Sequence, residues 1–269
     1  MNLNFGMRWC LALLTMCPSL SMSFKALVLR HGQTDANAAL IEQGSADFSR
    51  LTSLGRQQAI DAYQAFDDDN AAVSITSIYS SPLTRARETL QGLRQGDAKR
   101  ADPLLPATDL VLENLREIDL YDWEGKHETE LQTKFPDSWK AWREGTPDKL
   151  VVLDTKNDSS CIERYPLLEM WERADRVWDE IFEHEQQLHV SVDHEDEKEQ
   201  IALIVAHGNL GQALLGSAMG WNATQFNVHQ FPNCGIAEIE FSDYNKRQPK
   251  RWRFKWPLPP SEWNYHAAP

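Results

Sequence analysis

Two histidines in this sequence stand directly after short apolar runs of the length of a β-strand. His31 lies in the tripeptide Arg30-His31-Gly32, and His207 follows the apolar run at 201–206. A neutral imidazole nitrogen can attack a phosphorus atom, and a neighbouring arginine can hold phosphate oxygens in a fork geometry that lysine lacks. Glycine lets the backbone approach a bound anion without a clash from a Cβ atom. The residue types around His31 therefore indicate phosphoryl transfer, with His31 as the nucleophile.

Further hydrogen-bond donors lie close to the two histidines in the sequence or in the expected sheet. Thr34 and Asn37 can add neutral hydrogen bonds to a phosphate group. Arg85 is expected in the first turn of a helix that follows a strand, where the helix N-terminus already favours anions. A protonated His207, together with the backbone N–H of Gly208, can stabilise charge on the transferring phosphoryl group. We expect these residues to bind the phosphate of a substrate.

A proton donor is also needed, because an alkoxide leaves poorly unless a positioned acid protonates it. Two candidates, Glu117 and Asp119, lie two residues apart in a loop after an expected strand. Their spacing alone does not choose between them.

Alternating strand and helix patterns surround these motifs. Thr52 is a suitable N-cap for the first long helix, and Pro82 suits the first turn of the next one. The alternation predicts an α/β fold: a three-layer sandwich with a mostly parallel sheet and helices on both faces. Ligands bind beyond the carboxyl ends of the strands in such sheets, and both histidines fall at such an end. The predicted strands cover 25–29, 73–79, 108–112, 201–206 and 235–241, and the predicted helices begin at 52 and cover 83–93, 131–142, 167–188 and 210–219.

Composition limits the partners and the chemistry. The 269 residues carry a net charge of −13, which excludes a general nucleic-acid binder, since a phosphate backbone needs a basic face. A phosphate site must therefore be local, built from a few arginines inside an acidic shell. The sequence contains no HExxH motif, no CxxC pair and no carboxylate cluster with the spacing of a metal site. We expect the chemistry to need neither a metal ion nor another cofactor.

The N-terminus differs in composition from the rest of the chain. Arg8 precedes an apolar run at 9–17, which is too short to cross a bilayer as a helix, so no stable membrane insertion is expected. The pattern is typical of a targeting leader over residues 1–23, which would direct the protein to the secretory pathway or a plastid. Met22 is the alternative start of translation and would leave the protein in the cytoplasm.

Taken in order, these motifs resemble the histidine phosphatase superfamily, in the branch of cofactor-dependent phosphoglycerate mutase and its phosphatase relatives. The resemblance covers residues 24–245 as one domain and leaves 246–269, which is rich in Trp, Pro and basic residues, as a C-terminal tail. It implies that His31 becomes a phosphohistidine and that Glu117, rather than Asp119, transfers the proton. It also implies that Arg30, Arg85 and His207 bind the phosphoryl group. The motifs behind the resemblance are RHGxTxxN at 30–37, LTxxGxxQA at 51–59, SxLxRAxxT at 81–89 and the second histidine at 207.

Three further segments, at 115–121, 165–171 and 233–235, look like the plant and algal 2-carboxy-D-arabinitol-1-phosphatase-like proteins. Many phosphatases of this branch carry glycine where this chain has Tyr121, and we expect the larger side chain to reshape the substrate pocket. Mutases of the branch typically carry tryptophan where this chain has Ala36. We expect a small helical cap, inserted near 122–170, to lie over the site.

The expected activity is hydrolysis of a small phosphorylated metabolite, a sugar or sugar-acid phosphate, in two in-line displacements through His31. A mutase is the nearest alternative, since the same phosphohistidine could return its phosphate to a different hydroxyl; Ala36 weighs against it. A non-catalytic protein that binds a phosphorylated ligand is the other alternative, and the complete set of His31, Glu117 and His207 weighs against that. The sequence carries no signal for an oligomeric state.

Overall fold

The computed structural model describes residues 24–68, 71–72, 75–155, 161–190, 200–227, 229–243, 248–257 and 266–267. Its centre is a seven-stranded sheet in the order β11-β10-β9-β1-β8-β4-β5. Strands β1, β8, β4 and β5 are parallel to one another, whereas β9 runs antiparallel to β1, and β10 antiparallel to β9. The strands are β1 (Phe24–Arg30), β4 (Ser77–Ser80), β5 (Leu110–Val111), β8 (Gln200–Ala206), β9 (Ile236–Asp243), β10 (Gln248–Trp256) and β11 (His266–Ala267).

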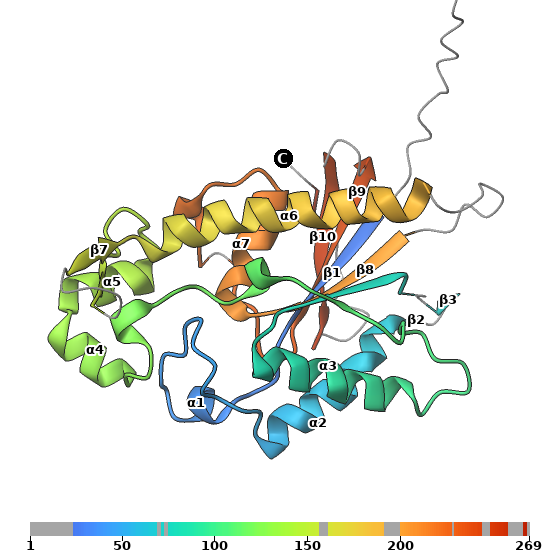
Figure 1. Ribbon diagram of the computed structural model, residues 1–269, viewed down its shortest axis with the longest axis horizontal. Coiled ribbons are helices and arrows are strands. Elements are labelled where there is room, and N and C mark those ends of the chain that lie inside the picture. The colour runs from blue at the N-terminus through green and yellow to red at the C-terminus, as the bar shows by residue number, and fades with distance from the viewer. Residues whose placement is uncertain are drawn as a thin grey trace, which may run out of the picture.

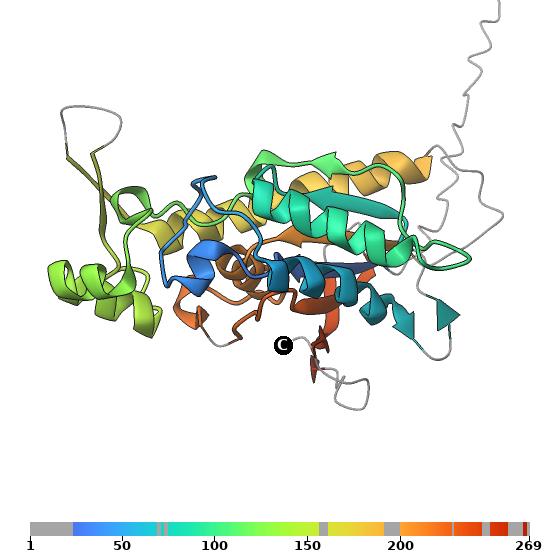
Figure 2. The ribbon, with the colours of Figure 1, turned by 90° about the horizontal axis from the view of Figure 1, so that it is seen from below.

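The sheet is the middle of three layers, which confirms the predicted α/β sandwich (Figure 1). Along β1, Ala26 and Val28 pack on one face and Leu27 and Leu29 on the other, in the period-two alternation of a strand. Figures 1 and 2 show one face covered by α6 (Pro166–Val190) and α7 (Gly208–Ala218), and the other by α2 (Ser53–Asp61) and α3 (Thr84–Asp97). Because both faces are buried, β1 and β8 appear in the sequence as nearly continuous apolar runs.

Local sequence explains where the helices begin. Thr52 caps α2, as predicted, because its side chain accepts a hydrogen bond from an amide of the first turn at 3.0 Å. Pro82 was expected inside the first turn of α3, but it lies one residue before the N-cap residue Leu83. The single helix predicted over 131–142 is two helices, α4 (Glu128–Lys134) and α5 (Pro136–Glu144). Pro136 lacks the amide hydrogen that would continue α4, and its fixed φ suits the first turn of α5.

A small helical insertion stands at one end of the molecule, where the sequence predicted a cap near 122–170 (Figure 1). It contains α4, α5 and the two-stranded pair of β6 (Val152–Asp154) and β7 (Ile162–Arg164). Asn227 joins α5 to the core. Its side-chain amide donates to the Trp142 carbonyl at 3.2 Å, and its backbone N–H donates to the side chain of Gln212 on α7 at 3.1 Å.

The sheet also contains residues that the sequence assigned to a tail after residue 245. β10 pairs with β9, and two buried carboxylates of β9 meet arginines of β10. Arg253 Nε lies 3.1 Å from Glu238 Oε1, and Arg251 Nε lies 2.6 Å from Glu240 Oε2. On the opposite face Trp252 packs into the core under α6 and α7. The last strands are thus fixed by ion pairs on one face and by aromatic packing on the other.

The predicted leader, residues 1–23, lies outside the described residues, and so does nearly all of the acidic segment 190–200. Among the helices of the described ranges, none is both long and apolar enough to cross a membrane.

Candidate active site

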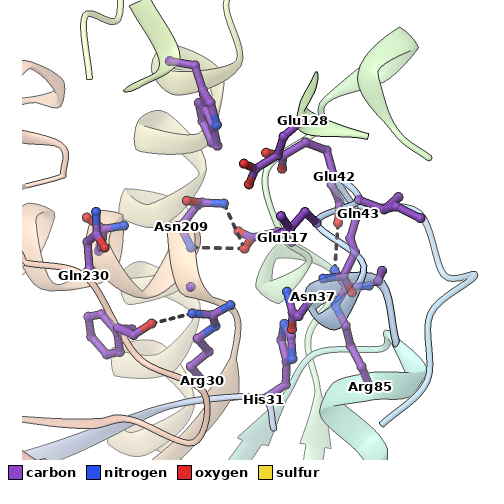
Figure 3. Close-up of a pocket in the computed structure, with 18 of the residues that line it drawn as sticks. Arg30, His31, Asn37, Glu42, Gln43, Arg85, Glu117, Glu128, Asn209 and Gln230 are labelled. Carbon is purple, nitrogen blue, oxygen red and sulfur yellow. Dashed lines mark hydrogen bonds between the residues drawn. The ribbon is translucent and has the colours of Figure 1, made fainter. Parts of the chain in front are cut away.

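The two histidines lie side by side at the carboxyl ends of adjacent parallel strands, as their sequence positions predicted. β1 and β8 pair in register up to Arg30 and Ala206, so His31 and His207 leave the sheet together. The His31 amide donates to the Ala206 carbonyl at 3.1 Å, and the two imidazole ring centres are 5.3 Å apart. A pocket of about 240 Å³ opens at this place (Figure 3), and the predicted site residues that line it are Arg30, His31, Asn37, Arg85, Glu117 and Gly208.

The hydrogen bonding of His31 distinguishes its two imidazole nitrogens. Its Nδ1 lies 2.8 Å from the carbonyl oxygen of Gly32. A carbonyl only accepts hydrogen bonds, so Nδ1 carries the proton and Nε2 keeps its lone pair. Burial, reinforced by the positive charges of Arg85 and Arg30, holds the pKa of His31 well below the ordinary value of 6.5. The neutral form that can attack phosphorus is therefore favoured at neutral pH.

The fully buried Arg85 and the partly buried Arg30 supply positive charge beside His31. Arg30 Nη1 donates to the Phe231 carbonyl, and the terminal nitrogens of Arg85 donate to the carbonyls of Gly44 and Ala46 at 2.7 and 2.9 Å. In the described part of the chain, the Nε atom of each arginine is buried without a hydrogen-bond partner. Burial lowers the pKa of Arg85 to about 10, which leaves it charged at neutral pH. Buried donors without partners are costly, and an anion bound in the pocket would give these two groups an acceptor.

Glu117 reaches the pocket from the loop that follows β5, and its carboxylate is held by the start of α7. Oε1 accepts hydrogen bonds from the backbone amides of Ile118 and Leu210, both at 2.9 Å. Oε2 accepts from the backbone and side-chain amides of Asn209 at 3.1 and 3.2 Å. Glu117 thus satisfies amides in the first turn of a helix that is distant in the sequence.

Two other candidates do not line the pocket. Asp119, the alternative proton donor, forms an ion pair with Arg173 at 2.7 Å. Thr34, expected to bind phosphate, caps the short helix α1 (Asp35–Ala38) instead, accepting a hydrogen bond from the Asn37 amide at 3.0 Å. Among these candidates the structure therefore brings Glu117 and Asn37 into the pocket and leaves Asp119 and Thr34 outside it.

His207 lies behind the pocket lining rather than in it. Its Nε2 is 2.7 Å from Ser81 Oγ, and its Nδ1 is buried without a hydrogen-bond partner among the residues that the structure places. Burial holds the pKa of His207 well below 6.5, so its surroundings favour the neutral ring and not the protonated one considered from the sequence. The neighbouring Gly208 lets Arg30 lie close, because a Cβ atom there would be 3.1 Å from Arg30 Nε.

The pocket wall opposite the arginines was not predicted from the sequence. Glu42 from the loop after α1, Glu128 from the first turn of α4, and Trp142 and Arg143 from α5 line it. Burial and the charges of Glu128 and Glu117 raise the pKa of Glu42 to about 7. These residues belong to none of the motifs, so only the folded chain brings them together. The remaining polar lining is a set of side-chain amides, Gln43, Asn209, Gln212, Asn227 and Gln230.

Tyr121 does not reshape the pocket as expected. Its φ of 48° lies in the left-handed region that glycine adopts readily, which fits the glycine found at this position in many phosphatases of the branch. Its hydroxyl donates to Glu169 on α6, its ring faces Arg164 at 5.3 Å, and it is not part of the pocket lining. Ala36 does line the pocket, where mutases of the branch typically carry the larger tryptophan.

Metal ligands do not gather in the ranges that the structure describes: no group of three or more His, Cys, Asp or Glu side chains there could hold a metal ion. The expectation of metal-independent chemistry remains a prediction.

Comparison with known proteins places the chain in a family. The sequence matches the histidine phosphatase superfamily (branch 1) over residues 26–254. It is 31% identical over 227 residues to 2-carboxy-D-arabinitol-1-phosphatase of Triticum aestivum, covering 84% of this chain but only 38% of that protein. It is 29% identical over 233 residues to glucosyl-3-phosphoglycerate phosphatase of Mycobacterium tuberculosis, covering 81% of this chain and 91% of that protein.

Solved structures agree on the fold. A mycobacterial glucosyl-3-phosphoglycerate phosphatase matches with a TM-score of 0.61 and 24% identity, over 86% of this chain and 97% of that chain. The α-ribazole phosphatase from Shigella flexneri matches with a TM-score of 0.61 and 21% identity, over 84% and 93%. The family match covers most of the sequence, and the site geometry lies within it. The chain belongs to branch 1 of the histidine phosphatase superfamily.

Proposed function

We propose that this protein hydrolyses phosphate monoesters of small metabolites through a phosphohistidine at His31. One observation carries the proposal: the lone pair of His31 Nε2 lies in a pocket with Arg30 and Arg85, whose buried Nε atoms have no hydrogen-bond partner among the described residues. This combination is a nucleophile beside a positively charged site for the phosphoryl group. The phosphatases among its relatives support the same activity.

The first displacement transfers the phosphoryl group to the protein. The lone pair of His31 Nε2 attacks phosphorus, a P–N bond forms, and the P–O bond to the leaving group breaks in line with the attack. Glu117 acts as the general acid and gives a proton to the leaving oxygen, so that the product departs as an alcohol. Asn209 and the start of α7 keep the Glu117 carboxyl in place during this transfer.

The second displacement releases phosphate. A water molecule attacks phosphorus, Glu117 takes the water's proton, and the P–N bond breaks to return neutral His31. Arg30 and Arg85 hold the phosphoryl oxygens through both steps, and their charge offsets the charge that accumulates in the transition state. The sum is ester plus water to alcohol plus inorganic phosphate.

His207 acts from behind the pocket in this mechanism. A phosphate dianion close to a neutral imidazole favours protonation of that ring, because an opposite charge stabilises the cation. Substrate binding would therefore raise the proton affinity of His207. The positive charge of the protonated ring is then present beside the phosphoryl group only while that group is bound. Ser81, 2.7 Å from His207 Nε2, holds the ring in its orientation.

The cavity supports a small substrate, since about 240 Å³ admits a phosphorylated metabolite and not a folded macromolecule. Ala36 lines the pocket and supports a phosphatase over a mutase, because mutases of the branch typically carry tryptophan at this position.

The experiment measures turnover and the covalent intermediate together. His31→Ala should lower kcat/KM on p-nitrophenyl phosphate by at least about a thousandfold, because the nucleophile is lost. The same change should abolish the acid-labile, base-stable phosphoprotein seen after rapid quenching of the wild type. His184→Ala is the matched control, since His184 bonds to Tyr79 and does not line the pocket.

Retention of more than a few per cent of activity in His31→Ala would contradict the covalent mechanism. Phosphate that reappears on a second hydroxyl, with little inorganic phosphate released, would identify a mutase. Binding of phosphorylated sugars without turnover would identify a binding protein.

A further inference from the structure

The pocket has two sides of opposite charge. Arg30 and Arg85 lie on one side with His31, and Figure 3 shows Glu42 and Glu128 on the other, with Glu117 between them. Arg85 is fully buried and its Nε has no hydrogen-bond partner among the described residues, which marks the arginine side as the place for the phosphate. The rest of a bound substrate must then extend from the phosphate towards the two glutamates.

Backbone hydrogen bonds hold these two glutamates next to each other. The Glu42 amide donates to the Lys126 carbonyl at 2.9 Å, and the Gly125 amide donates to the Glu42 carbonyl at 2.8 Å. The Glu128 amide donates to the Leu40 carbonyl at 3.0 Å. The loop after α1 is thereby fastened to the start of the cap, and the two carboxylates belong to one rigid unit.

The wall formed by Glu42, Glu128, Trp142 and Arg143 carries more negative than positive charge. Arg143, which is exposed, is the cation that acts on Glu42, and the Trp142 side chain donates a hydrogen bond to the Glu42 carboxylate. The pKa of Glu42 is raised to about 7 because burial and the charges of Glu128 and Glu117 oppose its ionisation. Any further negative charge brought to this wall meets the same repulsion.

We propose that this wall selects the part of the substrate that does not carry the phosphate: it accepts an uncharged, hydroxyl-bearing group and rejects a carboxylate. Hydroxyls can donate to Glu42 and Glu128, and the amides of Asn209 and Gln230 offer further donors and acceptors. A substrate carboxylate would instead face two carboxylates across a partly buried site, which is an arrangement that discriminates by repulsion.

This inference rests on the proposed function and narrows it. The substrates are phosphate esters of sugars or polyols, and sugar-acid phosphates are excluded. The expected substrate preference of this protein therefore differs from that of the Triticum aestivum relative, whose name specifies a carboxylated substrate.

The test compares substrates that differ at one carbon atom. Glycerol 3-phosphate and 3-phosphoglycerate share a skeleton, and a CH₂OH group in the first is a carboxylate in the second. At pH 8, kcat/KM should favour glycerol 3-phosphate by at least about tenfold, which equals about 1.4 kcal/mol. Arabinitol 1-phosphate and 2-carboxyarabinitol 1-phosphate form a longer pair, for which we expect the same preference.

Variants assign the preference to the wall. The double change Glu42→Gln and Glu128→Gln should raise kcat/KM for 3-phosphoglycerate relative to glycerol 3-phosphate by at least about fivefold, because it removes both charges at constant size. Glu130→Gln is the matched control, since Glu130 lies on the same helix, pairs with Lys134 at 2.9 Å and does not line the pocket. It should leave the ratio unchanged. p-Nitrophenyl phosphate, which has neither group, reports whether each variant is folded and active.

Equal kcat/KM values, or a preference for 3-phosphoglycerate that Arg143→Gln removes, would overturn the inference and leave the proposed function standing. A tenfold preference for O-phosphoethanolamine over glycerol 3-phosphate would also overturn it, because the wall would then bind a cation. Failure to hydrolyse any ester, p-nitrophenyl phosphate included, would contradict the proposed function itself.

Discussion

Replacing Glu117 by glutamine removes the proposed proton donor while keeping the size of the side chain. In the wild type, the two carboxylate oxygens accept four hydrogen bonds, from Ile118, Leu210 and both amides of Asn209. In the variant, one of the two terminal atoms becomes an NH₂ group that faces donors. The contacts on that side change from attraction to repulsion, whichever way the amide is turned.

Two consequences of different size follow from this change. Loss of a general acid costs about 10²–10⁴-fold in rate, or about 2.7–5.5 kcal/mol of activation free energy. Loss of hydrogen bonds to a charged, buried group costs about 1.5–3 kcal/mol, and this loss appears in the free energy of unfolding. Only the first consequence depends on the leaving group of the substrate.

The assay therefore compares two leaving groups in the same variant. A sugar alkoxide needs a proton to leave, whereas p-nitrophenolate leaves without one. In Glu117→Gln, phosphoenzyme formation should slow by about 10²–10⁴-fold with a sugar phosphate and by less than about tenfold with p-nitrophenyl phosphate. Rapid-quench measurement isolates this step, and urea unfolding of the same preparation measures the stability loss. Arg85→Gln is the control, because losing a phosphate-binding arginine should slow both substrates.

Equal slowing of phosphoenzyme formation with both leaving groups would refute the proton-donor role of Glu117. Asp119→Asn would then be the next variant to measure, although its carboxylate is paired with Arg173 at 2.7 Å.

Four more outcomes are expected. Because burial and Arg85 hold the pKa of His31 well below 6.5, phosphoenzyme formation from an aryl phosphate should persist from pH 7 to pH 6, and a rapid-quench titration with a midpoint near 6.5 would contradict this. Burial lowers the pKa of His207, so below about pH 6.5 the unfolded chain binds a proton at this residue that the folded chain does not. The free energy of unfolding should therefore decrease as the pH is lowered below 6.5, by up to about 1.4 kcal/mol per pH unit. Urea titrations should show a shallower decrease in His207→Gln. Turnover of p-nitrophenyl phosphate should survive dialysis against EDTA, since arginines supply the positive charge; activity lost to the chelator and restored by magnesium or manganese would reveal a metal site. Gly55→Ala should lower the free energy of unfolding by at least about 3 kcal/mol, because the new Cβ would lie 2.0 Å from the Gln33 carbonyl oxygen. Gly220→Ala, whose Cβ meets no atom of the described residues within 4 Å, should cost only about 1–2 kcal/mol through its positive φ, and equal losses in the two variants would refute the packing argument.

The centre of the site could be predicted because strand ends are visible in a sequence. β1 and β8 are apolar runs buried on both faces, and parallel neighbours end at the same edge of a sheet, so Arg30, His31 and His207 had to meet. The residues that hold or surround them depend on contacts between distant segments. Glu117 contacts Asn209 and Leu210 at the start of α7, which lie 92 and 93 positions further along the chain. The spacing of residues within a motif cannot predict a contact over such a distance in the sequence.

The edge of the sheet was missed although its signal was present. Residues 251–256 alternate basic and aromatic side chains, Arg-Trp-Arg-Phe-Lys-Trp, which is the period of a strand. The basic positions meet Glu238 and Glu240 on β9, while Trp252 enters the core. The composition of the segment, rich in aromatic and basic residues, does not by itself indicate a strand; only the alternation does. Glu42 and Glu128, by contrast, carry no local signal, since two loops joined through their backbones bring them together.

Arg85 links the stability of the protein to its affinity for an anion. The side chain is fully buried, and its two terminal nitrogens donate hydrogen bonds to the neutral carbonyls of Gly44 and Ala46. Burial of this cation is unfavourable, and the charges of Glu117, Asp47 and Glu124 offset the unfavourable free energy only in part, since the pKa of Arg85 is still lowered. The remainder belongs to the ligand-free protein. A phosphate that binds to Arg85 removes this unfavourable free energy, because it pairs the cation with an anion. Its affinity is therefore higher than its new contacts alone would give. The same carbonyls belong to the loop that carries Glu42, so ligand binding at one end of the pocket is mechanically connected to the wall at the other end.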